Sequence, residues 1–122
     1  MRLLVCVLLL VLTGHAWGQV AAKDYEASCS RGKGVVCWVL GAMYQIGGAV
    51  KQDYSKAIEL YTKACQFRFG LGCSSLGNMH RDGEGLKQDN LKAVELYAKA
   101  CELQYGEGCS SLGAMYQIGG GV

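Results

Sequence analysis

The cysteines are the residues with the clearest chemical potential in this sequence. The chain has 122 residues and seven cysteines, and no Cys-x-x-Cys pair occurs, which argues against a thiol–disulfide oxidoreductase. Six of the seven fall into two series in which neighbours are 36 residues apart: Cys29, Cys65 and Cys101, then Cys37, Cys73 and Cys109. In a small exported chain this number of cysteines predicts a disulfide framework.

A second pattern with chemical meaning is Ser30-Arg31-Gly32-Lys33, which matches the Ser-x-x-Lys string of serine β-lactamases. In those enzymes the serine is the nucleophile and the lysine lies beside it at the start of a helix. The accompanying Lys-Thr-Gly and Ser-Asp-Asn strings are absent here. Ser30 and Lys33 are therefore only weak catalytic candidates.

Metal and cofactor sites are not expected. Behind the N-terminal segment, His80 is the one histidine, whereas zinc hydrolases need several. The glycine-rich stretches each follow a predicted helix and close it, so none predicts a phosphate-binding loop. The formal net charge is +2, too small for a nucleic-acid-binding surface.

The first 18 residues predict a signal peptide. Arg2 precedes an apolar run over residues 3–12, which is too short for the roughly 20 residues of a membrane span. Ala16 and Gly18 are the small residues of a peptidase site, so we expect cleavage after Gly18. Cys6 leaves with this segment. A secreted or periplasmic protein without a membrane span is predicted.

The 36-residue period extends well beyond the cysteines and marks a repeated unit. Residues 53–86 and 89–122 share 19 identities in 34 aligned positions. The predicted units are 19–52, with a degenerate first helix, 53–88 and 89–122. Because the last unit ends without a polar cap, we expect an array that is truncated or that buries this face on a partner.

Each unit predicts two helices. Asp53 and Asp89 are favourable N-cap residues for helices over 54–67 and 90–103, with an apolar stripe of helical period. Gly70 and Gly72 are expected to break the first helix, so that the second begins near Cys73. The glycines recurring at 41, 77 and 113 lie inside this second helix, where they predict a close approach to Ala57 and Ala64 of the first.

The repeat selects one of the 15 possible disulfide connectivities. Each cysteine pair is eight residues apart, with one member at the end of the first helix and the other at the start of the second. A short turn brings these ends together, whereas bonds between units would leave equivalent cysteines with different partners. We therefore predict Cys29–Cys37, Cys65–Cys73 and Cys101–Cys109.

The unit A-[IV]-E-L-Y-x-K-A-C-x7-C-x2-L-G-x-M-x3-G-x-G resembles a Sel1-like repeat, and its cysteine pairs make it similar to the Helicobacter cysteine-rich protein family. The resemblance covers nearly all of the chain after residue 18. It implies an all-α, right-handed α/α solenoid of the TPR-like type, exported and with one disulfide in each repeat. Members of that family carry the label of β-lactamases or penicillin-binding proteins, which implies a β-lactam ligand and an amide hydrolase activity.

Solenoids keep a constant frame and bind through positions that vary between repeats. We expect a module that binds a protein, a peptide or a peptidoglycan-type fragment; the alternative is the β-lactamase activity of the family label. The residues that differ between the units and could contact a ligand are Trp38, Phe69, His80, Arg81 and Tyr105.

Overall fold

The computed structural model describes residue 2 and residues 21–119. These residues form six helices and no strand. The predicted signal segment, apart from residue 2, and the last three residues lie outside this part of the chain. The helices cover residues 21–30, α2 (Gly34–Ile46), α3 (Tyr54–Gln66), α4 (Gly70–Asp82), α5 (Asn90–Glu102) and α6 (Gly106–Ile118). None of them has the length and apolarity that a membrane span requires.

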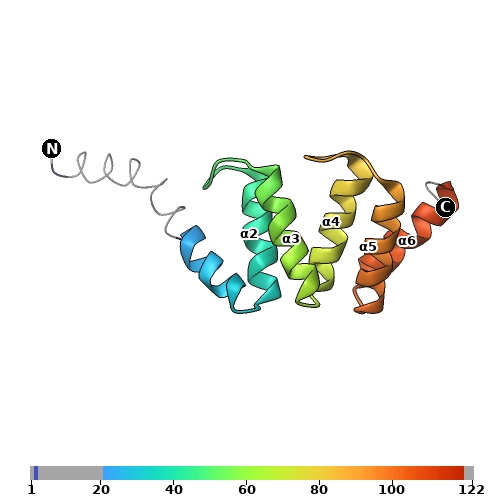
Figure 1. Ribbon diagram of the computed structural model, residues 1–122, viewed down its shortest axis with the longest axis horizontal. Helices are drawn as coiled ribbons and strands as arrows, with labels where there is room; N and C mark the ends of the chain where they lie inside the picture. The colour runs from blue at the N-terminus through green and yellow to red at the C-terminus, as the bar shows by residue number, and fades with distance from the viewer. Residues whose placement is uncertain (1, 3–20, 120–122) are drawn as a thin grey trace.

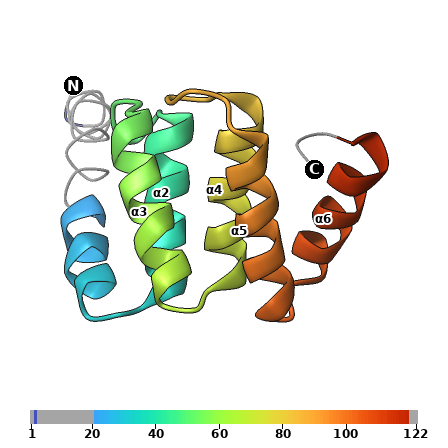
Figure 2. The same ribbon diagram turned by 45° about the vertical axis from the view of Figure 1, so that its right-hand side comes forward.

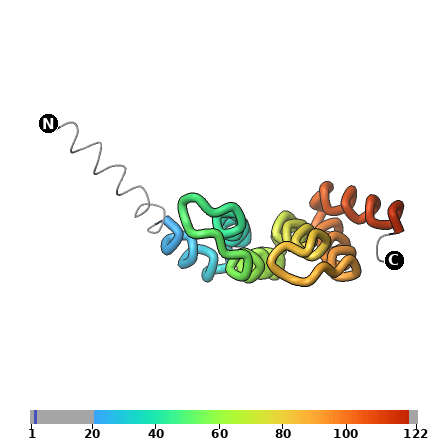
Figure 3. The backbone as a smooth tube through the Cα atoms, turned by 90° about the horizontal axis from the view of Figure 1, so that it is seen from above, coloured from blue at the N-terminus to red at the C-terminus, as the bar shows by residue number. Residues whose placement is uncertain are grey.

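The helices stand side by side along the long axis of the molecule (Figure 1). Seen from above, the helix at residues 21–30, α3 and α5 form one row, and α2, α4 and α6 form the other (Figure 3). Each first helix of a unit is therefore followed by a second helix in the opposite row. This arrangement confirms the predicted all-α solenoid of two-helix units.

The first helices begin where the sequence predicts. Asp53 precedes α3, and its carboxylate accepts a hydrogen bond from the backbone N–H of Lys56 at 3.0 Å. Asp89 caps α5 in the same way through the N–H of Lys92. In each case the side chain satisfies a backbone donor that has no partner within the helix.

The turn between the two helices differs from the prediction. Gly70 and Gly72 do not break a helix, because they lie in the first turn of α4. The chain instead leaves α3 at Arg68, whose φ of 62° is left-handed. The N–H groups of Arg68 and Phe69 donate to the carbonyls of Cys65 and Ala64, the two bonds of a Schellman motif. Gln104 repeats this conformation with a φ of 63°, and Gly32 occupies the equivalent position in the first unit.

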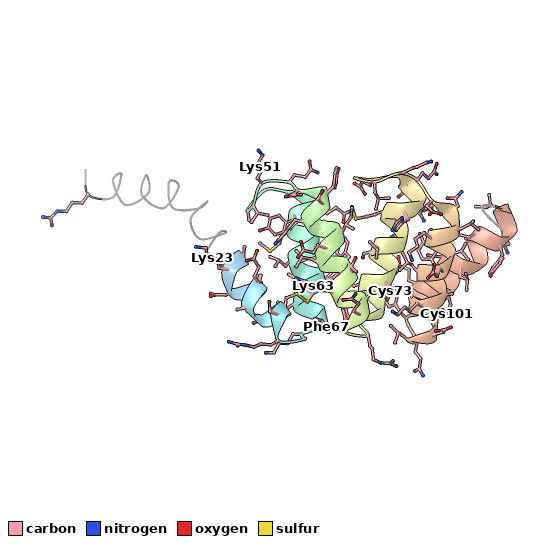
Figure 4. The ribbon with its side chains drawn as sticks, viewed as in Figure 1. Lys23, Lys51, Lys63, Phe67, Cys73 and Cys101 are labelled. Atoms are coloured by element: carbon pink, nitrogen blue, oxygen red, sulfur yellow. A yellow bond between two sulfur atoms is a disulfide. The ribbon has the colours of Figure 1, made fainter. Side chains whose placement is uncertain are left out.

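All three predicted disulfides are present. Cys29–Cys37, Cys65–Cys73 and Cys101–Cys109 join the two helices of their own unit, with Cα–Cα distances of 4.7, 4.6 and 4.5 Å. Cys37 and Cys73 are completely buried. Figure 4 shows Cys73 and Cys101 on the described chain. Each bond lies beside a tight turn with one residue at positive φ, which brings the two helix ends within reach of each other.

The recurring glycines of the second helices do not perform the expected role. A Cβ on Gly41 would lie 2.7 Å from the ring of Tyr61, and one on Gly77 would lie 2.8 Å from the ring of Tyr97. These glycines make room for a buried tyrosine of the following unit. The close contact with a small residue occurs instead at Gly72, where a Cβ would lie 2.5 Å from that of Ala64.

The last second helix is more exposed than the earlier ones. Leu40 in α2 and Leu76 in α4 are buried, whereas the equivalent Leu112 in α6 is only partly buried. A Cβ on Gly113 would have no neighbour within 4 Å among the atoms of the structure. Figure 2 shows α6 at the end of the row, against α5.

The glycine–tyrosine packing predicts opposite effects for one substitution at two equivalent positions. Gly77→Ala should destabilise the protein, since the displaced Tyr97 ring costs about 1–3 kcal/mol and better helix propensity returns only about 1 kcal/mol. Gly113→Ala meets no neighbour and should stabilise by up to about 1 kcal/mol. Urea unfolding of the oxidised variants measures both changes. Effects of equal sign and size would contradict this account.

The left-handed residues predict a stabilising substitution. Arg68→Gly replaces a side chain held at positive φ by the residue that the first unit uses there. Because such a conformation costs a non-glycine residue about 1–2 kcal/mol, partly offset by the greater chain entropy of glycine, we expect a gain of about 0.5–1 kcal/mol. Gln66→Gly, two residues earlier in the last turn of α3, is the control and should lose about 1 kcal/mol. Thermal unfolding distinguishes the two.

Candidate binding cleft

The five predicted ligand-contact residues fall into two groups at opposite ends of α4. Phe69 immediately precedes α4, and Tyr105 immediately precedes α6. Trp38 lies near the start of α2, at the same end of the unit. His80 and Arg81 lie in the last turn of α4. The structure therefore does not gather these five residues into one site.

The aromatic group packs between neighbouring second helices. The indole N–H of Trp38 donates to the Ser75 hydroxyl in α4 at 2.9 Å, and the Trp38 and Phe69 rings are tilted, with centroids 6.3 Å apart. A Cβ on Gly34 would lie 2.8 Å from the Cβ of Phe69. These contacts hold one unit against the next, and they occupy the indole donor that a ligand would need.

Tyr105 repeats the position of Phe69 one unit later. A Cβ on Gly70 would lie 2.7 Å from the Cβ of Tyr105, just as Phe69 packs on Gly34. The Tyr105 hydroxyl donates to the Glu107 carboxylate at 2.7 Å. Burial, followed by this hydrogen bond to Glu107, raises the pKa of Tyr105 to about 12. Its ring is therefore also a packing element between units.

His80 and Arg81 have different surroundings. The Nδ1 atom of His80 is buried without a hydrogen-bond partner, and burial lowers the pKa of this half-buried imidazole, so its neutral form is favoured. Arg81 donates to both carboxylate oxygens of Asp82, at 2.8 and 3.1 Å. The same hydrogen bonding lowers the pKa of Asp82. The positive charge of Arg81 is thus largely neutralised by its neighbour.

Ser30 ends the helix at residues 21–30, and Lys33 is the N-cap residue of α2. The Ser30 hydroxyl donates to the backbone carbonyl of Glu26 at 2.9 Å, and both residues of the string are exposed. Within residues 21–119, no hydrogen bond joins Ser30 to Lys33. The same part of the chain holds no cluster of three or more side chains suited to a metal ion.

The clearest concave site lies elsewhere, between the first unit and the start of the second. This cleft of about 820 Å³ opens to the surface above the loop that follows α2. Its walls come from the helix at residues 21–30, the end of α2, the loop 50–53, the start of α3 and Gly85 after α4. The side chains that matter most for its chemistry are Lys23, Glu26, Tyr44, Lys51, Tyr54 and Ser55.

The cleft depends on residues that differ between the units. Ala22 and Val50 are buried and line it, and the second unit places Ile58 and Leu86 at the equivalent positions. Ile58 packs against the core there. The methyl group of Ala22 is smaller than the branched side chain of Ile58 and leaves open space on this side of the first unit. A comparison of the equivalent residues in the sequence could have indicated this space.

The electrostatic environment inside the cleft is mixed. Burial, followed by the negative charge of Glu26, raises the pKa of Tyr44, so its hydroxyl stays protonated at neutral pH. The Gln52 amide donates to the Gln45 carbonyl at 2.8 Å and to the Tyr54 hydroxyl at 3.2 Å. These bonds fix the loop and the Tyr54 ring at the cleft's edge.

A polar contact that the sequence did not predict joins the first two units. The buried Tyr61 hydroxyl donates to the Gln45 side chain at 2.6 Å, and Gln45 donates to the Glu84 carboxylate at 3.0 Å. Burial raises the pKa of Tyr61 to about 12, so it remains a donor at neutral pH. In the next unit Tyr97 donates instead to Asn78. The recurrence of a tyrosine at equivalent positions of two units could have indicated these contacts, because a buried hydroxyl requires a hydrogen-bond partner.

Comparisons with known proteins agree with this architecture. The Sel1 repeat family model matches residues 35–66 and 70–105. Cysteine-rich protein B of Helicobacter pylori has 33% sequence identity and a TM-score of 0.73, over 77% of this chain and 71% of that one. No curated protein matches the sequence.

Two further solved structures share the fold. A Sel1 repeat protein from Oxalobacter formigenes has 22% identity and a TM-score of 0.77, over 84% of this chain. The protective antigen c5321 of uropathogenic Escherichia coli, which displays an SLR fold, has 27% identity and a TM-score of 0.73, over 80% of this chain. This chain spans only 42% of the first protein and 21% of the second.

The repeated hairpins, the intra-unit disulfides and the two matched segments lead to one assignment: the chain belongs to the Sel1 repeat family.

Proposed function

We propose that this protein is an exported binding module that holds an extended peptide segment of a partner protein in the cleft between its first two units. The observation that carries the proposal is the cleft itself. It is open to the surface, it is formed by two neighbouring units, and its lining differs from that of the second unit. Sel1 repeats typically mediate protein interactions, which supports a protein or peptide ligand.

The size and lining of the cleft suit a short peptide. Its volume of about 820 Å³ lies within the range of roughly 300–1,000 Å³ that is usual for ligand sites. The apolar floor at Ala22 and Val50 would accept an aliphatic side chain. The Tyr54 ring and the side-chain carbonyl oxygen of Gln52 offer contacts for a peptide backbone at the rim.

Export is supported by the chemistry of the cysteines. Three disulfides persist in oxidising compartments and are rare where thiols are kept reduced. Together with the similarity to a Helicobacter cysteine-rich protein, they indicate an extracytoplasmic protein. We propose that the signal peptide is cleaved after Gly18 and that the protein is then secreted or remains in the periplasm.

A bulky substitution at the cleft tests the proposed function. Peptides selected from a random heptapeptide phage library on the oxidised protein are synthesised, and their affinities are measured by fluorescence polarisation. Ser55→Trp fills the cleft from an exposed position in the first turn of α3, and we expect roughly tenfold weaker binding because the peptide loses its space.

The matched control is Leu91→Trp, which places the same ring at the equivalent exposed position of α5. It should leave the affinity unchanged. A library that yields no peptide, or peptides that bind equally well to both variants, would contradict binding in the cleft.

The alternative hydrolase activity has its own test. Because the Ser30 hydroxyl donates to a backbone carbonyl and forms no hydrogen bond with Lys33, we expect no turnover of a chromogenic cephalosporin by the oxidised protein. Hydrolysis that disappears in Ser30→Ala would identify Ser30 as a nucleophile and reverse this conclusion. Hydrolysis that persists in the variant would indicate a different catalytic residue.

A further inference from the structure

The charged residues that line the cleft differ in whether they already have a partner within the protein. The Glu26 carboxylate lies 3.9 Å from the Lys56 ammonium, and it also faces the Tyr44 hydroxyl. The Asp53 carboxylate accepts the N–H of Lys56 as the cap of α3. Both acidic groups of the cleft therefore already have partners within the protein.

The two lysines of the cleft lack such partners. Lys23 and Lys51 are exposed, and neither forms an ion pair with another described residue. Figure 4 shows Lys51 on the loop at the top of the molecule and Lys23 on the helix at residues 21–30. The two lysines of the cleft therefore come from different elements.

The first unit differs from the second in the charge at one of the two lysine positions. The residue equivalent to Lys23 in the second unit is Glu59, which is paired with Lys63 at 3.1 Å. Lys51 has the equivalent Lys87 in the second loop. The first unit thus combines an open cleft with two lysines, whereas the second combines Ile58 with a neutral Glu59–Lys63 pair.

We propose that the cleft selects an extended acidic peptide, with two separated carboxylate side chains for Lys23 and Lys51 and an aliphatic residue between them for the floor at Ala22 and Val50. This inference rests on the proposed function and specifies its ligand class. Two lysines on different elements favour a peptide with two carboxylates over a single carboxylate. The apolar floor disfavours an anion without an aliphatic group.

A synthetic array tests the charge preference directly. It carries acetylated peptide amides with two Glu residues flanking one Leu at several spacings, the other positions being randomised, and matched sets with Gln or Lys in place of Glu. The full-length oxidised protein should bind the Glu set best. Lys51→Glu and Lys23→Glu should each weaken that binding by roughly fivefold, as expected for reversal of a solvent-exposed charge contact.

The matched control is Lys87→Glu, which makes the same change of net charge at the equivalent position of the second loop. It should preserve the preference for Glu. Binding to the array without preference for Glu would overturn this inference and leave peptide binding in place. An equal loss in Lys87→Glu would also overturn it, because the preference would then reflect net charge. Absence of binding to every set, together with an unproductive phage library, would remove the proposed function as well.

Discussion

The fold depends on the contact between a glycine in α2 or α4 and a tyrosine in the first helix of the following unit. Tyr61 lies on Gly41 and Tyr97 lies on Gly77, at distances where any Cβ would collide with the ring. The large apolar ring is completely buried, so it must also bring its hydroxyl to a polar partner. Gln45 and Asn78 are those partners. One steric requirement thus determines both how the units pack and where a polar side chain must lie to accept a hydrogen bond from the tyrosine.

Two kinds of stabilising contact alternate along the chain: disulfides within units and helix packing between units. Within a unit, the disulfide joins the helix ends beside the turn. Between units, α2 packs extensively on α3, and α4 on α5, more so than α3 on α4 within one unit. The covalent bonds therefore lie at the interfaces with the less extensive packing. Because each unit contacts mainly its neighbours, as in solenoids generally, both kinds are needed for a chain of this size to hold its shape.

The sequence predicted the features that repeat and failed on those that depend on single residues. The period, the Asp caps and the disulfides follow from spacing, since equivalent residues need equivalent partners. The left-handed Arg68 was missed because arginine carries no signal for positive φ, and only the alignment with Gly32 would have revealed it. Trp38 and Phe69 differ between units and looked like ligand contacts, yet packing between helices accounts for them. The cleft was not predicted because it arises from a small residue, Ala22. The comparison of the repeats instead drew attention to large side chains that differ between units.

The repeat geometry also supports the proposed binding role over the alternative hydrolase activity. A catalytic site requires several different groups to converge within hydrogen-bond distance of one reacting atom. Translation along a solenoid does the opposite, because it places equivalent side chains one unit apart and so keeps repeated lysines and serines from meeting. Binding of an extended ligand requires only groups spread over a surface, which is what neighbouring units provide. In this chain the departures from the repeat at Ala22 and Lys23 alter space and charge at one interface, and the proposed selectivity of the cleft rests on such local differences on a constant frame.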